Sequence, residues 1–241
     1  MVAKAAILTA STCRETFLPF SPPDITEAEI EAVVDALRSG WLTTGPKVRQ
    51  FEQAFASYLG AESALALSSC TAGLHLALAA LGVGPGDEVI TTPLTFCSSV
   101  HVIEYVGAKP VLADIDPETL TIDPARVAEA VTRRTKAILP VHFAGHPADM
   151  APLVDLARHH GLDLVEDAAH AFPAAYRGQP VGTIGDFTAF SFYATKNLTT
   201  GEGGMLTGWP LNVERARLLS LHGMSRDAWK RYGVEGSWYY E

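Results

Sequence analysis

Residues 63–92 read "SALALSSCTAGLHLALAALGVGPGDEVITT" and contain the repeating unit that decides the fold. A short apolar run at 63–68 leads into small and hydroxylated residues, then into an apolar stretch through Leu81 that is long enough for a helix. Glycine and proline interrupt the chain before a second apolar run at 87–92. This order is typical of two parallel strands joined by a helix.

The same alternation continues along the chain. Further apolar runs of strand length, separated by segments that are long enough for helices or by turn residues, lie at 110–115, 136–141, 162–167, 187–192 and 203–208. We therefore predict an α/β fold with a mostly parallel central sheet and helices on both faces.

Two helices are predicted before the first strand. The first begins after Asp24, with Asp24 or Thr26 as its cap, and places Ile30, Val33, Val34 and Leu37 on one face. A second amphipathic helix follows the turn at 41–46. We interpret residues 1–16 as a loose leader, because their apolar run is too short for a secretory core.

Composition narrows the class of protein. The 241 residues carry 18 Lys+Arg against 27 Asp+Glu, a formal net charge of −9, and no basic block, which argues against nucleic acid and acidic membrane surfaces as partners. Cys13, Cys70 and Cys97 form no CxxC pair, so neither a disulfide framework nor a metal site is expected. A reducing, cytoplasmic location fits this cysteine content best.

The carboxyl ends of parallel strands are where ligands bind in such sheets, and polar or aromatic residues follow five of the predicted strands. One of these stretches, "SSCTAG" at 68–73, joins a strand to a helix. Its free N–H groups would suit a phosphate, although an ordinary N-cap by Ser69 or Thr71 explains it equally well. Neither a Walker loop nor a GxGxxG motif is present.

Asp167 and His170 lie in "VEDAAHA" at 165–171, directly after a buried strand. A carboxylate at that position is costly unless it meets a cation, such as a protonated ring nitrogen. The alternative is that Asp167 caps a helix over 168–171, on which His170 would lie near it. A lone histidine is more often structural than catalytic, so both roles stay open for His170.

Phe96 and Lys196 are two further candidate ligand-binding residues that follow predicted strands. Phe96 is a core aromatic by default, but after a strand end its ring could stack on a flat ligand. Lys196 lies between an apolar strand and a glycine turn, where poor solvation favours the neutral, nucleophilic amine. A phosphate cradle, a carboxylate for a ring nitrogen, an aromatic face and such a lysine together fit pyridoxal phosphate (PLP).

Six stretches resemble the DegT/StrS-type sugar aminotransferases, and within that family most resemble enzymes that aminate UDP-linked 4-keto-arabinose or related 4-keto sugars. They are "LRSGWLTTGPKVRQFE" (37–52), "SSCTAGLHLALAALGVGPGDEVITTPLTF" (68–96), "VGAKPVLADID" (106–116), "AILPVHFAGHPADM" (137–150), "VEDAAHA" (165–171) and "SFYATKNLTTGEGG" (191–204). The resemblance implies the large domain of the fold type I PLP-dependent transferases over residues 17–241, with a small C-terminal domain beyond this chain.

The resemblance also implies roles for individual residues. Lys196 matches the Schiff-base lysine, Asp167 the partner of the pyridine nitrogen, and His170 a polar side chain beside the cofactor ring. The phosphate-binding set is Cys70, Thr71, Ala72 and the hydroxyl of Ser191, with Phe96 stacked on the ring. Thr43, Thr44 and Gly45 match a segment close to the substrate sugar.

The activity implied is transfer of an amino group, from glutamate, to a nucleotide-linked keto sugar by a homodimer with a shared site. Two alternatives remain. A PLP-dependent sugar dehydratase has the same fold, but enzymes of that kind carry histidine at the position of Lys196. A non-catalytic PLP-fold regulator or assembly subunit is the other.

Overall fold

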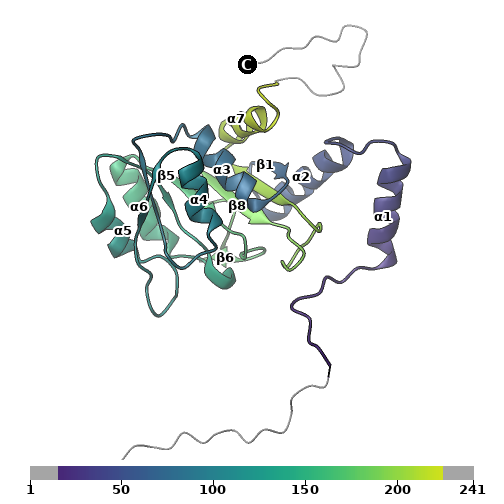
Figure 1. Ribbon diagram of the computed structural model, residues 1–241, viewed down its shortest axis with the longest axis horizontal. Helices are drawn as coiled ribbons and strands as arrows, with labels where there is room; N and C mark the ends of the chain where they lie inside the picture. The colour runs from purple at the N-terminus through teal and green to yellow at the C-terminus, as the bar shows by residue number, and fades with distance from the viewer. Residues whose placement is uncertain (1–15, 225–241) are drawn as a thin grey trace, which may run out of the picture.

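The computed structural model describes residues 16–224 (Figure 1). Its strands are β1 (Ser63–Leu67), β2 (Glu88–Thr91), β3 (Lys109–Leu112), β4 (Thr135–Leu139), β5 (Asp163–Asp167), β6 (Ala175–Tyr176), β7 (Gln179–Pro180), β8 (Phe187–Ser191) and β9 (Gly204–Gly208). Its α-helices are α1 (Glu27–Arg38), α2 (Pro46–Leu59), α3 (Cys70–Ala80), α4 (Ser98–Tyr105), α5 (Pro124–Ala130), α6 (Met150–His160) and α7 (Pro210–Ser220), and a 3-10 turn, η1, spans Phe143–Gly145. Of the predicted leader, only Thr16 belongs to the described residues.

Seven strands form one sheet in the order β1-β9-β8-β5-β4-β2-β3. The neighbouring pairs from β8 through β5, β4 and β2 to β3 are all parallel, whereas β9 runs antiparallel to both β1 and β8. Strand β1 therefore has the same direction as the parallel strands, and its carboxyl end lies at the same edge. The predicted mostly parallel sheet is confirmed.

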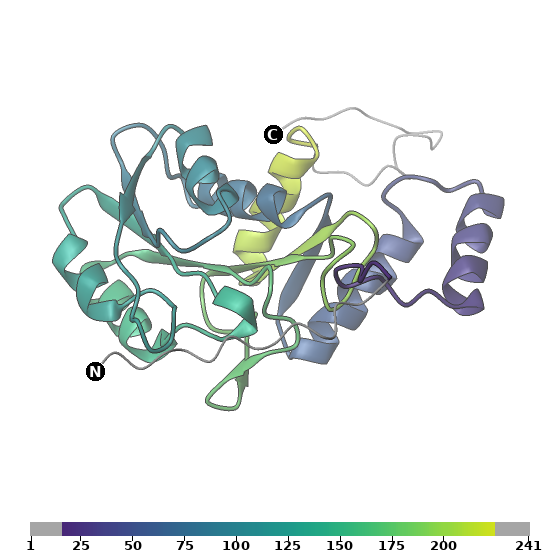
Figure 2. The same ribbon diagram turned by 60° about the horizontal axis from the view of Figure 1, so that its bottom comes forward.

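Helices cover both faces of this sheet, as predicted (Figure 2). Helices α3 and α7 pack against each other and on β9, and α4 packs on α3 and β2, which places all three on one face. Helices α5 and α6 pack together against β4 and β5 on the other face, and α2 packs on β1. Alternate residues of each strand enter the two cores because successive side chains point to opposite faces: Ile138 joins one core and Leu139 the other.

Helix α1 stands apart from the sheet at one end of the molecule (Figure 1). Its cap is Thr26 rather than Asp24, because Thr26 Oγ1 accepts the Ala28 N–H while the Glu29 carboxylate accepts the Thr26 N–H at 2.7 Å, a capping box. The predicted apolar face is present, yet Ile30, Val33 and Leu37 are exposed, and no residue of α1 is buried. The amphipathic sequence forms a helix as predicted, but no other part of the described chain covers its apolar face.

Membrane insertion of a helix is not indicated in the part of the chain that the structure describes. Within residues 16–224, none of the helices combines the length and apolar content needed to cross a bilayer.

Candidate active site

A cavity of about 710 Å³ opens at the edge where β1, β2, β4, β5 and β8 end. Its volume is within the range of small-molecule pockets. The residues that the sequence predicted and that line it are Cys70, Thr71, Phe96, Asp167, His170, Ser191 and Lys196. Residues up to 126 positions apart therefore meet at one place because the strands that carry them are parallel.

The N-terminus of α3 forms one wall of the cavity. Ser69 is the helix cap, and its Oγ accepts the Ala72 N–H at 3.1 Å. The N–H groups of Cys70 and Thr71 have no acceptor among the described residues, so they remain available to an anion at the positive end of the helix. The N-cap interpretation is confirmed with Ser69 as the cap, and the phosphate-binding interpretation stays a prediction that the two free N–H groups are consistent with.

Gly204 on β9 allows the chain to come close to this helix start. A Cβ at Gly204 would lie 2.6 Å from the Cys70 backbone nitrogen and 2.4 Å from the Ser69 carbonyl carbon. Any side chain would therefore displace the 69–70 peptide that leads into the free N–H groups. Gly204, the last residue of "GEGG" (201–204), is therefore required by the close packing of β9 against the start of α3.

Asp167 is 4% exposed at the end of β5 and fixed by neutral donors. Ser99 Oγ donates to its Oδ2 at 2.7 Å, and the Ala169 N–H donates to its Oδ1 at 3.1 Å. Within residues 16–224 no cationic nitrogen lies at ion-pair distance from this carboxylate. A buried carboxylate facing a cavity in this way is suited to a ligand that brings a positive charge.

The alternative interpretation, in which Asp167 caps a helix over 168–171, is wrong. Asp167 is followed by a turn, because the Ala168 N–H donates to Ala189 of β8 and the Ala171 N–H closes back on Ala168. Asp167 accepts one N–H of this turn, so it fixes the turn rather than capping a helix.

Lys196 lies half-buried in the loop after β8, with no side-chain hydrogen bond in the described part of the chain. Desolvation lowers the pKa of its amine, and the charge of Asp167 only partly opposes this. The shift agrees with the poor solvation expected from the sequence. A larger fraction of this amine is neutral near pH 7 than of an ordinary lysine.

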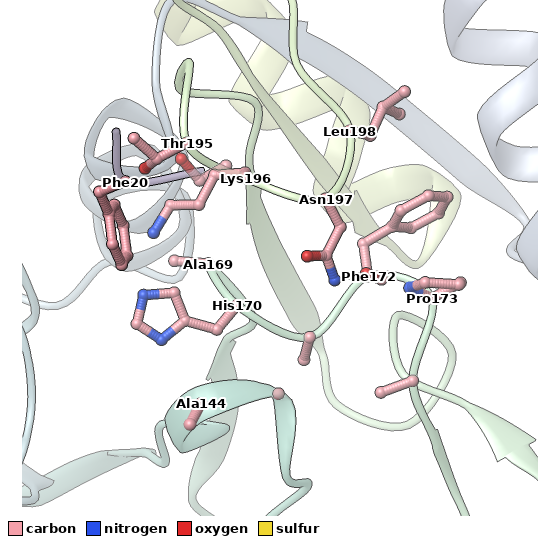
Figure 3. A pocket seen from close by; sticks show the side chains of 14 residues that line it. Phe20, Ala144, Ala169, His170, Phe172, Pro173, Thr195, Lys196, Asn197 and Leu198 are labelled. Carbon is pink, nitrogen blue, oxygen red and sulfur yellow. Dashed lines mark hydrogen bonds between the residues drawn. The ribbon is translucent and has the colours of Figure 1, made fainter. Parts of the chain in front are cut away.

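Two neighbours of Lys196 stay uncharged. Burial, followed by the nearby charge of Asp167, raises the pKa of the Cys70 thiol well above its usual value, so Cys70 is a thiol and not a nucleophilic thiolate. Partial desolvation and the charge of Lys196 lower the pKa of His170, which favours a neutral imidazole. Figure 3 shows the Lys196 amine directed toward the space above the His170 ring.

Phe96 is 73% exposed at the mouth of the cavity, so the default interpretation as a core aromatic is wrong. The ring is free to cover a flat ligand.

The other predicted positions lie outside the cavity lining. Ala72 forms only the capping bond described above. Thr43, Thr44 and Gly45 precede α2, where the Thr44 carbonyl accepts the Trp41 indole N–H at 3.1 Å. The described residues do not bring this segment to the cavity.

His142, which lines the cavity, forms a fully buried pair with Glu166, and the sequence did not predict this pairing. The Ala148 N–H donates to His142 Nδ1, so His142 Nε2 carries the proton and donates to Glu166 at 2.9 Å. The other Glu166 oxygen accepts from Gly185 N–H and Thr188 Oγ1. The sequence placed His142 after one strand and the consecutive acids of "VED" at the end of another, but no local pattern links the two residues.

The Glu166→Gln variant should lose about 1–3 kcal/mol of unfolding free energy, the cost of a buried donor without an acceptor. Both oxygens of Glu166 accept hydrogen bonds, whereas the glutamine amide has only one oxygen. In one orientation the glutamine NH2 faces the His142 Nε2–H, and in the other it faces the Gly185 and Thr188 donors. Switching the His142 tautomer would set Nδ1–H against the Ala148 N–H. Urea unfolding measures the loss. The control is Glu118→Gln, an exposed position, and an equal effect of the two substitutions would contradict this network.

The site residues fit PLP. Two unpaired helix N–H groups match its phosphate, the uncompensated Asp167 carboxylate matches a protonated ring nitrogen, and the Lys196 amine matches its aldehyde. Together with the sheet topology, they define a PLP-dependent transferase fold. The chain belongs to the DegT/DnrJ/EryC1/StrS aminotransferase family, whose sequence model matches residues 23–238.

Relatives and solved structures agree with this assignment. The "Spore coat polysaccharide biosynthesis protein SpsC" of Bacillus subtilis is 57% identical over 229 residues, which are 95% of this chain and 59% of that protein. The "Putative sugar aminotransferase Spr1654" of Streptococcus pneumoniae in its PMP form superposes with a TM-score of 0.84 and 42% identity, over 93% of this chain and 62% of the other. Its PLP form superposes with a TM-score of 0.80 and 44% identity, over 86% and 58%.

These similarities imply PLP as the cofactor, as predicted from the sequence. The chain spans about 59% of the length of the curated relatives it matches.

Proposed function

We propose that this chain is the cofactor-binding large domain, residues 17–241, of an aminotransferase that moves an amino group from glutamate to a nucleotide-linked keto sugar. The observation that carries the proposal is the meeting of the Lys196 amine, the Asp167 carboxylate and two free helix N–H groups in one cavity. Family membership and the sugar aminotransferase among the solved neighbours support it.

Each residue has a proposed task. The bound cofactor supplies an electron sink and a carbonyl carbon that exchanges amino groups. Lys196 Nζ holds it covalently and, once released by the donor, carries a proton to and from the donor Cα. Asp167 keeps the ring nitrogen protonated. Thr71 and Cys70 N–H groups, with the Ser191 hydroxyl, bind the phosphate, and Phe96 covers the ring.

The acceptor is proposed to be a UDP-linked 4-keto sugar of the arabinose type or a related 4-keto sugar, made in the cytoplasm for a cell-surface polysaccharide. The resemblance of the six quoted stretches supports the subtype, and similarity to SpsC, a spore coat polysaccharide biosynthesis protein, supports the polysaccharide as the destination. A homodimer is proposed because α1 presents an uncovered apolar face, which sedimentation at micromolar concentration tests.

The visible spectrum of the PLP-loaded chain tests the function. Glutamate should remove the absorbance of the lysine-bound cofactor, and the keto sugar should restore it. D-glutamate, which presents its Cα hydrogen on the wrong side, serves as the control. A spectrum that glutamate leaves unchanged would refute the proposal.

A further inference from the structure

Ser99 is a buried polar residue to which the proposed function gives no task. It lies in the first turn of α4, and Val102 and Ile103 on the same buried face of this helix belong to the apolar core. The Ser99 side chain is completely buried. A buried hydroxyl is costly unless it is hydrogen-bonded, so its partners indicate what it does.

The direction of the hydrogen bonds at Ser99 follows from its single hydroxyl proton. Its Oγ lies 2.7 Å from Asp167 Oδ2 and 2.7 Å from Thr95 Oγ1. Because an ionised carboxylate can only accept, the bond to Asp167 uses the Ser99 proton. The Thr95 hydroxyl must then donate to Ser99, which gives a chain of donors from Thr95 through Ser99 to Asp167.

The bond to Asp167 differs from the one that a serine near a helix start commonly makes. Such hydroxyls often bond to backbone groups of their own turn, and the Phe96 carbonyl offers that partner to Ser99 at the longer distance of 3.3 Å. The contact with Asp167 instead joins residues 68 positions apart, and a bond to an ionised acceptor is the stronger kind. It ties the start of α4 to the end of β5.

The two oxygens of Asp167 are held separately. Oδ1 accepts the Ala169 N–H, and within residues 16–224 Oδ2 accepts only the Ser99 hydroxyl, although a carboxylate oxygen can accept two bonds. Rotation of the carboxyl group would break both of these bonds. A cationic N–H that enters the cavity therefore meets a carboxylate of fixed orientation with an acceptor position still open.

Ser99 can act on a ligand only through Asp167. Among the described residues, Thr95 and Asp167 line the cavity and Ser99 does not. We propose that Ser99 is a positioning residue that orients Asp167 toward the ring nitrogen of the cofactor, and that Thr95 in turn orients the Ser99 hydroxyl. This inference rests on the proposed role of Asp167 toward that nitrogen.

Equilibrium binding of two aldehydes to the chain freed of cofactor tests this inference. The probes are PLP and 1-deazapyridoxal 5′-phosphate, in which a C–H group replaces the ring nitrogen and the aldehyde is unchanged. The native chain should bind PLP about tenfold more tightly or better, since only PLP can form the charge-assisted bond to Asp167.

Ser99→Ala should remove this preference. It should weaken PLP binding about tenfold and leave binding of the deaza analogue within about twofold, because the analogue does not sense the orientation of Asp167. Ser99→Thr keeps the hydroxyl and should retain the native preference. Thr95→Val should weaken PLP binding about threefold, since Ser99 keeps its proton but loses the group that orients it.

Thr91→Val is the matched control, because the fully buried Thr91 hydroxyl donates to the Leu139 carbonyl at 2.9 Å on β2, two strands from β5. It should leave the preference unchanged. The inference is overturned if Ser99→Ala weakens both aldehydes equally or neither of them, if Ser99→Thr loses the preference, or if Thr91→Val matches Ser99→Ala.

The native chain separates this inference from the proposed function. If the native chain binds the two aldehydes equally, Asp167 does not hold the ring nitrogen, and both the role of Asp167 and the inference are overturned. If the native chain prefers PLP and Ser99→Ala keeps that preference, the inference alone is overturned.

Discussion

Lys196→Ala should abolish covalent attachment of PLP and lower turnover by at least about a thousandfold, since the substitution removes both the attachment point and the proton carrier. Desolvation lowers the pKa of this amine, and no neighbour in the described chain holds its side chain by a hydrogen bond. The amine is therefore both more often neutral and freer to react than an exposed lysine.

Borohydride reduction followed by peptide mass mapping measures the attachment. The native chain should carry the pyridoxyl mass on the peptide that contains Lys196, and Lys109→Ala should leave that label unchanged. Lys109 is a suitable control because it is exposed and pairs with Glu88 at the opposite edge of the sheet. A label on Lys109 or Lys136 in the native chain would disprove the assignment.

The order of the elements could be predicted because each strand of the large sheet is an apolar run bounded by turn residues. The edge that carries the site followed from strand direction alone, which is why Asp167, Ser191 and Lys196 were found together. The small hairpin of β6 and β7 was not predicted, since two-residue strands leave no periodicity to detect.

What the sequence did not predict depends on contacts between distant segments. His142, the partner of Glu166, lies 24 positions away in the segment after β4, and no local pattern links the two residues. Ser21 Oγ donates to the Thr195 carbonyl in a hydrogen bond that spans 174 positions. The solvent exposure of α1 is a third case, because an amphipathic pattern indicates that one face will be covered without indicating what covers it.

Asp167→Ala should keep the cofactor attached to Lys196 but lose most transamination. The proposed phosphate-binding groups at Cys70, Thr71 and Ser191 are untouched, so binding and attachment should persist. An unprotonated ring nitrogen accepts electrons poorly, and loss of a charge-assisted hydrogen bond in the transition state should cost about a hundredfold or more in rate. Single-turnover rates, normalised to the absorbance of bound cofactor, measure the effect.

Asp167→Asn separates charge from structure in the same experiment. The amide preserves an acceptor for the Ala169 N–H and a polar partner for Ser99, so the turn after β5 remains fixed. A purely structural Asp167 predicts near-native turnover for this variant and a stability loss of about 1 kcal/mol for Asp167→Ala. A role in charge predicts that both variants lose rate equally.

Asp163→Ala is the matched control, because Asp163 lies at the other end of β5 and faces Lys136 at 3.9 Å, away from the cavity. It should change stability without changing the rate per loaded molecule. If either Asp167 variant keeps more than about a tenth of the native rate, a loss below about 1.4 kcal/mol, the carboxylate does not hold the ring proton. The buried, uncompensated charge of Asp167 would then require another ligand cation to explain it.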